Sequence, residues 1–341
     1  MTKLQVGIVG GTGYTAHELL KILLRHPDVN VAFITSESKT GTSVADYFPD
    51  LPPDNFLNFK EIDSQNFDSV DVVFLCTPHG ESQKIVPQIL GAGTKVIDLS
   101  GDYRLRTPDS YKNWYKMPHA DSPHLGNAVY GLPEIYREQI RQAALVANPG
   151  CYPTGALLSL IPLAKSGAIR PEKIFIDAKS GVSGAGKKLT QLAHFVEANE
   201  NLTPYNAGHT HRHIGEIEQE LQTAFNRNIP VVFVPQLVPL NRGILETIYI
   251  DRPAVKNQQQ ILEILKDFYR KEPFVRILDD KLPAIQMAAG TNFCFIGAVY
   301  DRETDVLIVV NSFDNLLKGA SGQAVQNMNI LFNLNETTAL I

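Results

Sequence analysis

The sequence predicts an α/β protein with two parts: a Rossmann-type, doubly wound parallel sheet domain and an α+β catalytic domain with a mixed, largely antiparallel sheet. Two observations carry this prediction. The first 150 residues alternate strand-like and helix-like segments from a glycine turn onward. After residue 151, strand-like runs follow one another with fewer intervening helices. A chain of 341 residues, 44% hydrophobic, has enough apolar material for two cores.

Composition excludes several classes of function. The net charge of -5 gives no basic surface for nucleic acid, and no apolar run approaches the ~18 residues that span a bilayer. The N-terminus enters a strand at once, so we expect no signal peptide. Cys76, Cys151 and Cys294 lie far apart, which indicates neither a disulfide framework nor a zinc site. We therefore expect a cytoplasmic protein without a metal.

The first element is a strand at residues 4–9, followed by a glycine turn and an amphipathic helix whose leucines recur from residue 19 to residue 24. The turn reads G-x-x-G-x-x-G, a variant of the dinucleotide motif, and a plain βα turn is the alternative. Its place at the first strand–helix junction favours a pyrophosphate bound by the helix N-terminus. The candidate cofactor residues here are Gly10, Gly11, Thr12, Gly13, Tyr14 and Thr15.

The next strand, residues 30–35, leads into "TSESKTG". The hydroxyls of Ser36 and Ser38 with the cation of Lys39 suit the extra phosphate of NADP, whereas Glu37 suits the free ribose of NAD. We expect NADP(H). Strands over 71–78 and 95–101 flank a helix over 81–93, and their ends, 77–80 with Pro78 and 100–104, are placed for a cofactor or substrate crevice. We expect Cys76 to lie in the core.

Cys151 stands in "VANPGCYPTG", between a strand at 144–148 and an apolar, helix-compatible segment at 154–165. Such a corner offers unpaired backbone N–H groups and the positive end of a helix dipole. These favour a thiolate, so we interpret Cys151 as a nucleophile. The boundary between the two domains falls near this residue, and we expect Cys151 to lie in the cleft between them.

The second half supplies five further strands, at 173–181, 230–240, 243–251, 293–301 and 306–315. A proton carrier for Cys151 is sought in "HTHRHIGEIEQELQTAF", residues 209–225, where 214, 217, 221 and 225 form one apolar helix face. His213 and Glu216 share another face, and a carboxylate beside a histidine orients the ring. A solvated helix start or a metal site are the alternatives. We favour acid–base chemistry, because no acidic or cysteine cluster accompanies the histidines.

"SGVSGAGKK", residues 180–188, matches the phosphate loop until its last position, where Lys188 replaces the hydroxyl that would bind magnesium. A flexible loop is one alternative, and a glycine-rich loop shaping an anion pocket near the thiol is our preference. Residues 314–334 predict a glycine-containing turn and an apolar helix.

Together these segments resemble the N-acetyl-gamma-glutamyl-phosphate reductase family, a relative of aspartate-semialdehyde dehydrogenase. The motifs that carry the resemblance occur in the family's order between residues 4 and 334: "GGTGYTAHELL", "VIDLSGDYRL", "VYGLPE", "NPGCYPTG", "SGVSGAGK", "HRHIGEIEQEL" and "NLLKGASGQAVQNMN".

The resemblance implies an NADPH-dependent reduction of N-acetyl-L-glutamyl 5-phosphate to the 5-semialdehyde through a Cys151 thioester, in arginine biosynthesis. It implies His213 as the acid–base residue, with His211 and Glu216 beside it. It also implies a nucleotide domain of residues 1–150 and 315–341, a catalytic and dimerisation domain of residues 151–314, and a homodimer or homotetramer. The further cofactor candidates are Ser183, Gly184, Asn315, Gly319 and Gln323, and the substrate or phosphate candidates are Arg104, Ser180, Tyr205 and Asn148.

Two departures from the family pattern stand out. Gly215 replaces a proline, and Glu37 stands where an arginine often follows the serine. Three other functions stay open. They are reduction of a carrier-protein-linked aminoadipyl or glutamyl phosphate, which the net charge of -5 disfavours, aspartate-semialdehyde dehydrogenase activity, and a non-enzymatic nucleotide-sensing module.

Overall fold

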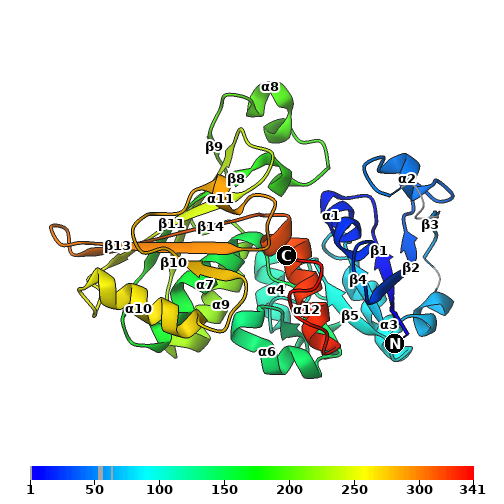
Figure 1. The fold of residues 1–341 in the computed structure, drawn as a ribbon, viewed down its shortest axis with the longest axis horizontal. Coiled ribbons are helices and arrows are strands. Elements are labelled where there is room, and N and C mark those ends of the chain that lie inside the picture. Colours follow the sequence, from blue (N-terminus) through cyan, green and yellow to red (C-terminus); the bar gives the residue numbers. More distant parts are fainter. Residues whose placement is uncertain (1, 53–56, 63) are drawn as a thin grey trace. The chain divides into compact units, whose positions relative to one another are not determined.

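A computed structural model describes residues 2–52, 57–62 and 64–341, and the chain divides into two compact units (Figure 1). The first unit comprises residues 1–149 and 320–341, and the second comprises residues 150–319. Within the described residues, no helix has the length and apolar character needed to cross a membrane.

The first unit is built on a seven-stranded parallel sheet in the order β3-β2-β1-β4-β5-β7-β6. Its strands are β1 (Leu4–Val9), β2 (Val29–Thr35), β3 (Phe59–Lys60), β4 (Val72–Leu75), β5 (Lys95–Asp98), β6 (Val129–Tyr130) and β7 (Leu145–Ala147). Its helices are α1 (Tyr14–Leu23), α2 (Val44–Tyr47), α3 (Ser82–Gly91), α4 (Pro108–Tyr115), α5 (Ser122–Leu125), α6 (Pro133–Gln142), α12 (Gly322–Leu331) and the short 3₁₀ helix Ser64–Ser69. The strand order reverses between β1 and β4, where the doubly wound fold binds its ligands.

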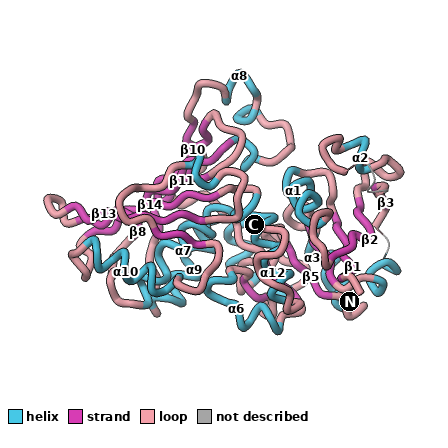
Figure 2. The backbone as a smooth tube through the Cα atoms, in the orientation of Figure 1, coloured by secondary structure: helices cyan, strands magenta, loops and turns pink. Residues whose placement is uncertain are grey.

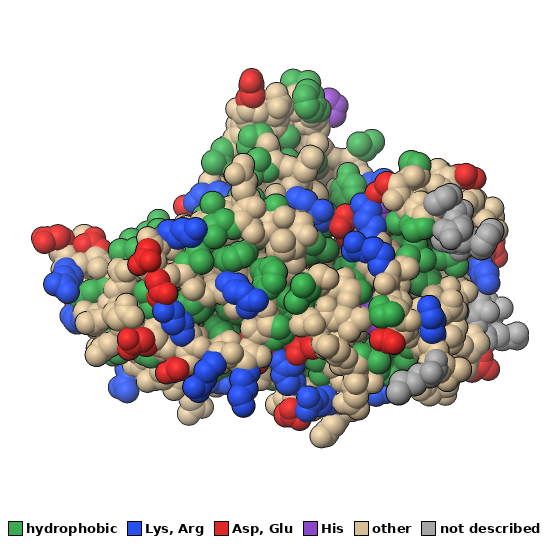
Figure 3. Space-filling model, viewed as in Figure 1, with side chains coloured by type: hydrophobic (Ala, Val, Ile, Leu, Met, Phe, Trp, Pro, Cys, Tyr) green, Lys and Arg blue, Asp and Glu red, His purple; other side chains and the backbone are tan. Residues whose placement is uncertain are grey.

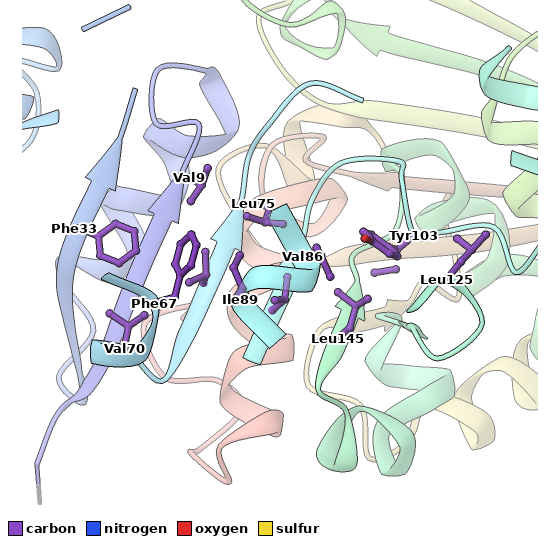
Figure 4. Close-up of a cluster of buried hydrophobic side chains, with 13 residues drawn as sticks. Val9, Phe33, Phe67, Val70, Leu75, Val86, Ile89, Tyr103, Leu125 and Leu145 are labelled. Carbon is purple, nitrogen blue, oxygen red and sulfur yellow. The ribbon is translucent and has the colours of Figure 1, made fainter. Parts of the chain in front are cut away.

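The predicted parallel sheet and its first strand–turn–helix are confirmed. Apolar side chains from both the strands and α3 pack into one cluster, which includes Val9, Phe33, Leu75, Val86 and Leu145 (Figure 4). The prediction for Cys76 was wrong in detail. It follows β4 instead of lying within it, and its residue is only partly buried.

The second unit is built on a seven-stranded mixed sheet in the order β12-β13-β14-β11-β8-β10-β9. Its strands are β8 (Ile174–Gly181), β9 (Thr203–Pro204), β10 (Val231–Val238), β11 (Ile244–Asp251), β12 (Val275–Ile277), β13 (Cys294–Asp301) and β14 (Val306–Phe313). Its helices are α7 (Cys151–Lys165), α8 (Phe195–Ala198), α9 (His213–Phe225), α10 (Gln258–Tyr269), α11 (Ile285–Ala288) and the 3₁₀ helices Val182–Ala185 and Gln191–Ala193. Strands β8 and β10 are parallel, as are β12 and β13, and the other pairs are antiparallel. The predicted mixed, largely antiparallel sheet is therefore confirmed.

The strands of the second unit lie side by side in one sheet (Figure 2). Alternating burial along β8, β10 and β11 shows that one face of this sheet is packed and the other is half-exposed. Helix α7 packs against β11 and β14, and α9 packs against α7 and β10. Residues 186–202 leave the sheet as an excursion that carries α8, and hydrophobic side chains lie on its surface (Figure 3). They are Leu189, Leu192, Phe195, Val196 and Leu202.

Candidate active site

Cys151 is the first residue of α7, and Gly150 is the N-cap. The first turn of α7 itself carries no acidic residue, and its backbone N–H groups and dipole favour a negative charge on the Cys151 side chain. Helix N-termini are where proteins place reactive thiolates. The structure thus places Cys151 at the strand-to-helix corner that the sequence predicts, three residues earlier than the start of the helix-compatible segment.

Glu216 ties the start of α7 to the start of α9. One oxygen, Oε2, accepts a hydrogen bond from the Gly150 N–H at 3.0 Å. The other, Oε1, lies 3.9 Å from Nε2 of His213, the first residue of α9. Both residues are buried. A single carboxylate therefore holds the backbone before Cys151 and faces the histidine, and the alternative of a solvated helix start is wrong.

His211, two residues before His213, is held in its neutral form. Its Nδ1 accepts a hydrogen bond from the His213 backbone N–H at 3.2 Å. Burial, followed by the nearby charge of Arg212, lowers the pKa of His211 to about 3. His211 is therefore neutral at physiological pH, with its proton on Nε2.

His209, the third histidine of the series, turns to the surface and pairs with Glu218 at 3.0 Å. Within the described part of the chain, no group of three His, Cys, Asp or Glu residues is arranged to hold a metal. Of the apolar face predicted for α9, positions 214, 217 and 221 are buried, and Phe225 is only half-buried.

A ring of aromatic side chains lies beside the histidines. The Tyr152 ring makes edge contacts with His211, His213 and Phe233, at centroid distances of 5.7, 5.8 and 5.1 Å. Its hydroxyl is 2.9 Å from the hydroxyl of Tyr205, one of the predicted substrate residues. Tyr152 was not singled out from the sequence, and its place directly after the candidate nucleophile Cys151 is the signal that could have found it.

The turn after β14 approaches Cys151. Residues Leu317–Ser321 form a π-helix, and a Cβ added to Gly319 would lie 3.1 Å from Cβ of Cys151. Asp314, a second residue missed from the sequence, anchors this turn. Its Oδ1 accepts from the Leu316 and Leu317 N–H groups at 2.9 and 3.2 Å, and its Oδ2 lies 2.9 Å from Nε of Arg242.

The glycine-rich loop at 180–188 is tied to the loop after β10. The N–H groups of Gly181, Val182 and Ser183 donate to carbonyls of residues 243, 240 and 241, at 2.9, 2.8 and 3.1 Å. These three N–H groups therefore do not cradle an anion. Asn315 bridges the two loops, because its Oδ1 accepts from the Gly243 N–H at 2.6 Å and its Nδ2 donates to the Ser183 hydroxyl at 2.9 Å. Ser180 is buried, and its Oγ would be 2.7 Å from a Cβ at Gly184.

In the first unit, the glycine turn fits a dinucleotide. Gly10 has φ +85°, and a Cβ there would lie 2.7 Å from the Cys76 carbonyl oxygen. A Cβ at Gly11 would lie 2.4 Å from the Ile34 side chain, so the backbone of Gly11 packs directly against this residue of strand β2. Gly13 is the N-cap of α1 and has open space where a Cβ would be. The turn thus leaves room for a ligand at the helix N-terminus.

Gln323, at the start of α12, is a further candidate for contact with the ligand. Its side chain is fully buried, and neither of its amide atoms has a hydrogen-bond partner among the described residues. A buried amide needs partners. The neighbouring Ser321 donates to the Thr15 carbonyl at 2.8 Å, which places the start of α12 beside the start of α1. These groups fit a nicotinamide dinucleotide.

The other predicted cofactor residues surround the end of β2. Ser36 and Ser38 have hydroxyls 3.5 Å apart, and the Lys39 ammonium lies 5.6 Å from the centre of the Tyr47 ring. Pro78 lies in the loop after β4, beside the glycine turn.

Two predicted substrate residues lie at the ends of β5 and β7. Arg104 is buried, and it donates to the carbonyls of Asn148 and Leu99, each at 2.8 Å. The Asn148 side chain donates to the Ala320 carbonyl at 3.1 Å and accepts from Asn327 at 3.0 Å. Of the predicted site residues, Arg104 and Asn148 lie in the first unit. The second unit holds Cys151, His211, His213, Glu216, Ser180 and Tyr205.

The chain matches two family models. Residues 5–143 match the NAD binding domain of semialdehyde dehydrogenase, and residues 151–315 match its dimerisation domain. Among solved structures, aspartate semialdehyde dehydrogenase II of Vibrio cholerae, complexed with ASA, superposes with a TM-score of 0.75 at 19% identity, covering 98% of this chain and 99% of that one. The Candida albicans enzyme with NADP gives a TM-score of 0.72 at 18% identity over 97% of this chain and 99% of that one. These structures share the fold.

Curated relatives are much closer in sequence. N-acetyl-gamma-glutamyl-phosphate reductase of Desulforudis audaxviator is 48% identical over 99% of this chain and 98% of its own length. Those of Pelotomaculum thermopropionicum and Methanococcus vannielii are each 46% identical over 98% of this chain and 97% of their own lengths. Because relatives this similar match it over nearly their whole length and both family models match along it, this chain belongs to the N-acetyl-gamma-glutamyl-phosphate reductase family.

Proposed function

We propose that the protein catalyses the NADPH-dependent reduction of N-acetyl-L-glutamyl 5-phosphate to N-acetyl-L-glutamate 5-semialdehyde, with release of phosphate. The observation that carries the proposal is Cys151 at the N-terminus of α7, held by the same Glu216 that faces His213. Relatives up to 48% identical over nearly the whole chain bear the name of this activity.

The chemistry divides into two steps. The Cys151 thiolate forms a bond to the acyl carbon and breaks the bond from that carbon to phosphate, which leaves a thioester. Backbone N–H groups at the start of α7 stabilise the oxyanion that forms at each tetrahedral stage. The bound nicotinamide supplies the hydride that reduces the thioester. His213 accepts the thiol proton before attack and returns a proton to the sulfur as it leaves.

The first unit would hold the cofactor. The turn from Gly10 to Thr15 would receive the pyrophosphate, and the buried amide of Gln323 would find its hydrogen-bond partners on the bound cofactor. Gly319 lies beside Cys151, and with Asn315, Ser183, Gly184 and Pro78 it completes the set of residues that we propose for cofactor contacts. Arg104 provides the positive charge for the substrate phosphate, since the carbonyls of Leu99 and Asn148 fix its guanidinium.

We assign NADP as the preferred cofactor, with Ser36, Ser38 and Lys39 on its 2′-phosphate. Replacing Lys39 with alanine is expected to raise KM for NADP about tenfold while leaving KM for NAD unchanged, because only NADP carries the charge that Lys39 meets. Initial-rate kinetics with both cofactors measure this. An equal rise for both cofactors would place Lys39 elsewhere.

The partner in this proposal is a second copy of the chain, in the cytoplasm. Register across the second sheet aligns Val232, Phe175, Tyr249, Ile308 and Val299, one from each of five neighbouring strands, on the half-exposed face. Val232 and Tyr249 are 36% and 37% exposed. An apolar row of this width on one sheet face is suited to a self-complementary interface.

An assay in the oxidative direction tests the reaction. Phosphate and NADP are mixed with N-acetyl-glutamate semialdehyde, aspartate semialdehyde or a carrier-linked semialdehyde in turn, and NADPH is followed by absorbance. We expect turnover with the N-acetyl compound. Preference for either of the other two would replace the proposed substrate.

Cys151→Ser tests the mechanism. We expect loss of turnover with cofactor affinity retained, because a serine hydroxyl stays protonated where a thiol ionises. Mass spectrometry of the wild-type protein mixed with the acyl phosphate alone is expected to show an acyl adduct on the Cys151 peptide. An unmodified peptide in that experiment would exclude the thioester.

A further inference from the structure

Tyr47 is an aromatic residue of the first unit that the proposed function does not use. It is the last residue of α2, beside β3 (Figure 1), and it is half-buried. Two buried rings meet the Tyr47 ring edge-on. They are Phe48, with a centroid distance of 4.7 Å and an interplanar angle of 75°, and Phe59 of β3, at 5.5 Å and 89°. The Tyr47 ring is therefore held in one orientation close to the end of β2, with which β3 pairs.

The ammonium group of Lys39 lies over this ring, 5.6 Å from its centroid. A cation within about 6 Å of the centroid of a tyrosine ring is attracted by the negative face of the ring. Lys39 itself is exposed. An exposed lysine side chain samples many rotamers in water unless a contact restricts it. The Tyr47 ring thus restricts where the positive charge of Lys39 lies.

The backbone of Lys39 is fixed as well. Its carbonyl accepts a hydrogen bond from the Thr42 N–H at 3.0 Å, which closes a turn. Within this turn, Gly41 has φ +81°, in the left-handed region that glycine adopts without strain, and its N–H donates to the Phe59 carbonyl at 2.8 Å. The turn therefore holds the Lys39 main chain against β3, and the Tyr47 ring holds the end of the Lys39 side chain.

We propose that Tyr47 is a positioning residue that holds the Lys39 ammonium in place for the 2′-phosphate of NADP(H), and that it thereby helps the protein to discriminate against NAD(H). The inference rests on the proposed function and deepens it, because it names a residue that sets the cofactor preference. A side chain that is ordered before binding loses less rotamer freedom when the ligand arrives. An ammonium group has three N–H donors, so contact with the ring leaves donors for phosphate oxygens.

The test measures cofactor binding to the full-length protein without substrate. NADPH and NADH differ only in the 2′-phosphate, and both are fluorescent, so titration gives a Kd for each. Tyr47→Leu removes the ring and keeps an apolar side chain. We expect it to raise Kd for NADPH about two- to fivefold and to leave Kd for NADH unchanged. Tyr47→Phe keeps the face of the ring, so it should bind both cofactors as the wild type does.

A double variant separates a positioning role from a structural one. Lys39→Ala leaves no ammonium for Tyr47 to hold, so adding Tyr47→Leu to it should not change Kd for NADPH any further. Phe268→Leu is the matched control. It removes the ring of a similar pair in the second unit, where the Lys165 ammonium lies 5.7 Å from the Phe268 centroid. This control should leave both Kd values unchanged.

The outcomes separate the inference from the proposed function. If Tyr47→Leu weakens NADPH and NADH equally, or weakens NADPH further in the Lys39→Ala background, the ring has a structural role only and the inference is wrong. It is also wrong if Tyr47→Leu binds NADPH as tightly as the wild type does. If the wild-type protein binds NADH as tightly as NADPH, the assignment of NADP fails before any variant is made, and the inference fails with it.

Discussion

The two histidines on either side of Arg212 are alike in sequence and unlike in what their rings can do. His211 has Nδ1 occupied by a backbone N–H, and its pKa of about 3 keeps it neutral. His213 has Nε2 facing the Glu216 carboxylate at 3.9 Å. A proton carrier must take up and release a proton near neutral pH, which His211 does not do in this environment.

We therefore predict that His213→Asn lowers the rate of the chemical step by about 10²–10⁴-fold, while His211→Asn lowers it only a few-fold. Single-turnover kinetics of NADPH formation measure that step directly. The pH profile adds a second readout: the acidic limb of kcat should stay in place in His211→Asn, since the folded-state pKa of His211 lies below the range in which the limb falls. Equal losses in the two variants would contradict this assignment.

At the scale of elements, helices and strands were predicted best where a single sequence pattern determines the secondary structure. Strand β1, its turn and α1 follow from an apolar run, four glycines and a leucine period, and the observed bounds agree. The start of α7 was predicted less well, because Pro153 obscures the helix even though proline is compatible with its first turn. Helix α10 was not predicted, although Asn257 caps it.

The site itself was predicted in part. Cys151, His213 and Glu216 carry recognisable chemistry at recognisable spacing. Tyr152 and Asp314 do not, because their roles depend on contacts with Tyr205 and Arg242, which lie 53 and 72 residues away in the chain. Long-range pairings of this kind arise from the folded sheet and leave no local pattern.

The glycine turn before α1 allows a prediction with a built-in control. Gly13→Ala should leave the unfolding transition unchanged, because the Gly13 φ of -81° suits alanine and its Cβ would meet no atom within 4 Å. The same methyl group would enter the space assigned to the pyrophosphate, so we expect Kd for NADPH to rise about tenfold or more. Fluorescence titration of NADPH and thermal denaturation measure the two effects.

Gly91→Ala supplies the comparison. Gly91 ends α3, is exposed and likewise has no atom within 4 Å of its added Cβ. Here alanine should stabilise the fold by about 0.5–1 kcal/mol without altering NADPH affinity. If Gly13→Ala behaved like Gly91→Ala in both measurements, the cofactor would bind elsewhere.

At the scale of the whole molecule, the two units differ in how helices cover their sheets. The parallel sheet of the first unit has helices from both ends of the chain, since α12 packs against α1 and α6. The mixed sheet of the second unit has its helices α7, α9 and α10 in contact with it or with each other, and one face stays half-exposed. Antiparallel sheets tolerate such a face when it is polar. This one carries the apolar row from Val232 to Val299.

We predict that this row is covered by a second copy of the chain. Val232→Lys places a charge among apolar side chains that a dimer would bury, and an unpaired buried charge costs several kcal/mol, whereas on the isolated chain the same side chain extends into water. Sedimentation equilibrium should therefore show a dimer or larger assembly for the wild-type protein and a weakened one for Val232→Lys, with the circular dichroism unchanged. Ile62→Lys, the same replacement at an exposed site of the first unit, should assemble as the wild type does. A wild-type protein that sediments as a monomer at micromolar concentration would leave the apolar row open to solvent and refute the interface.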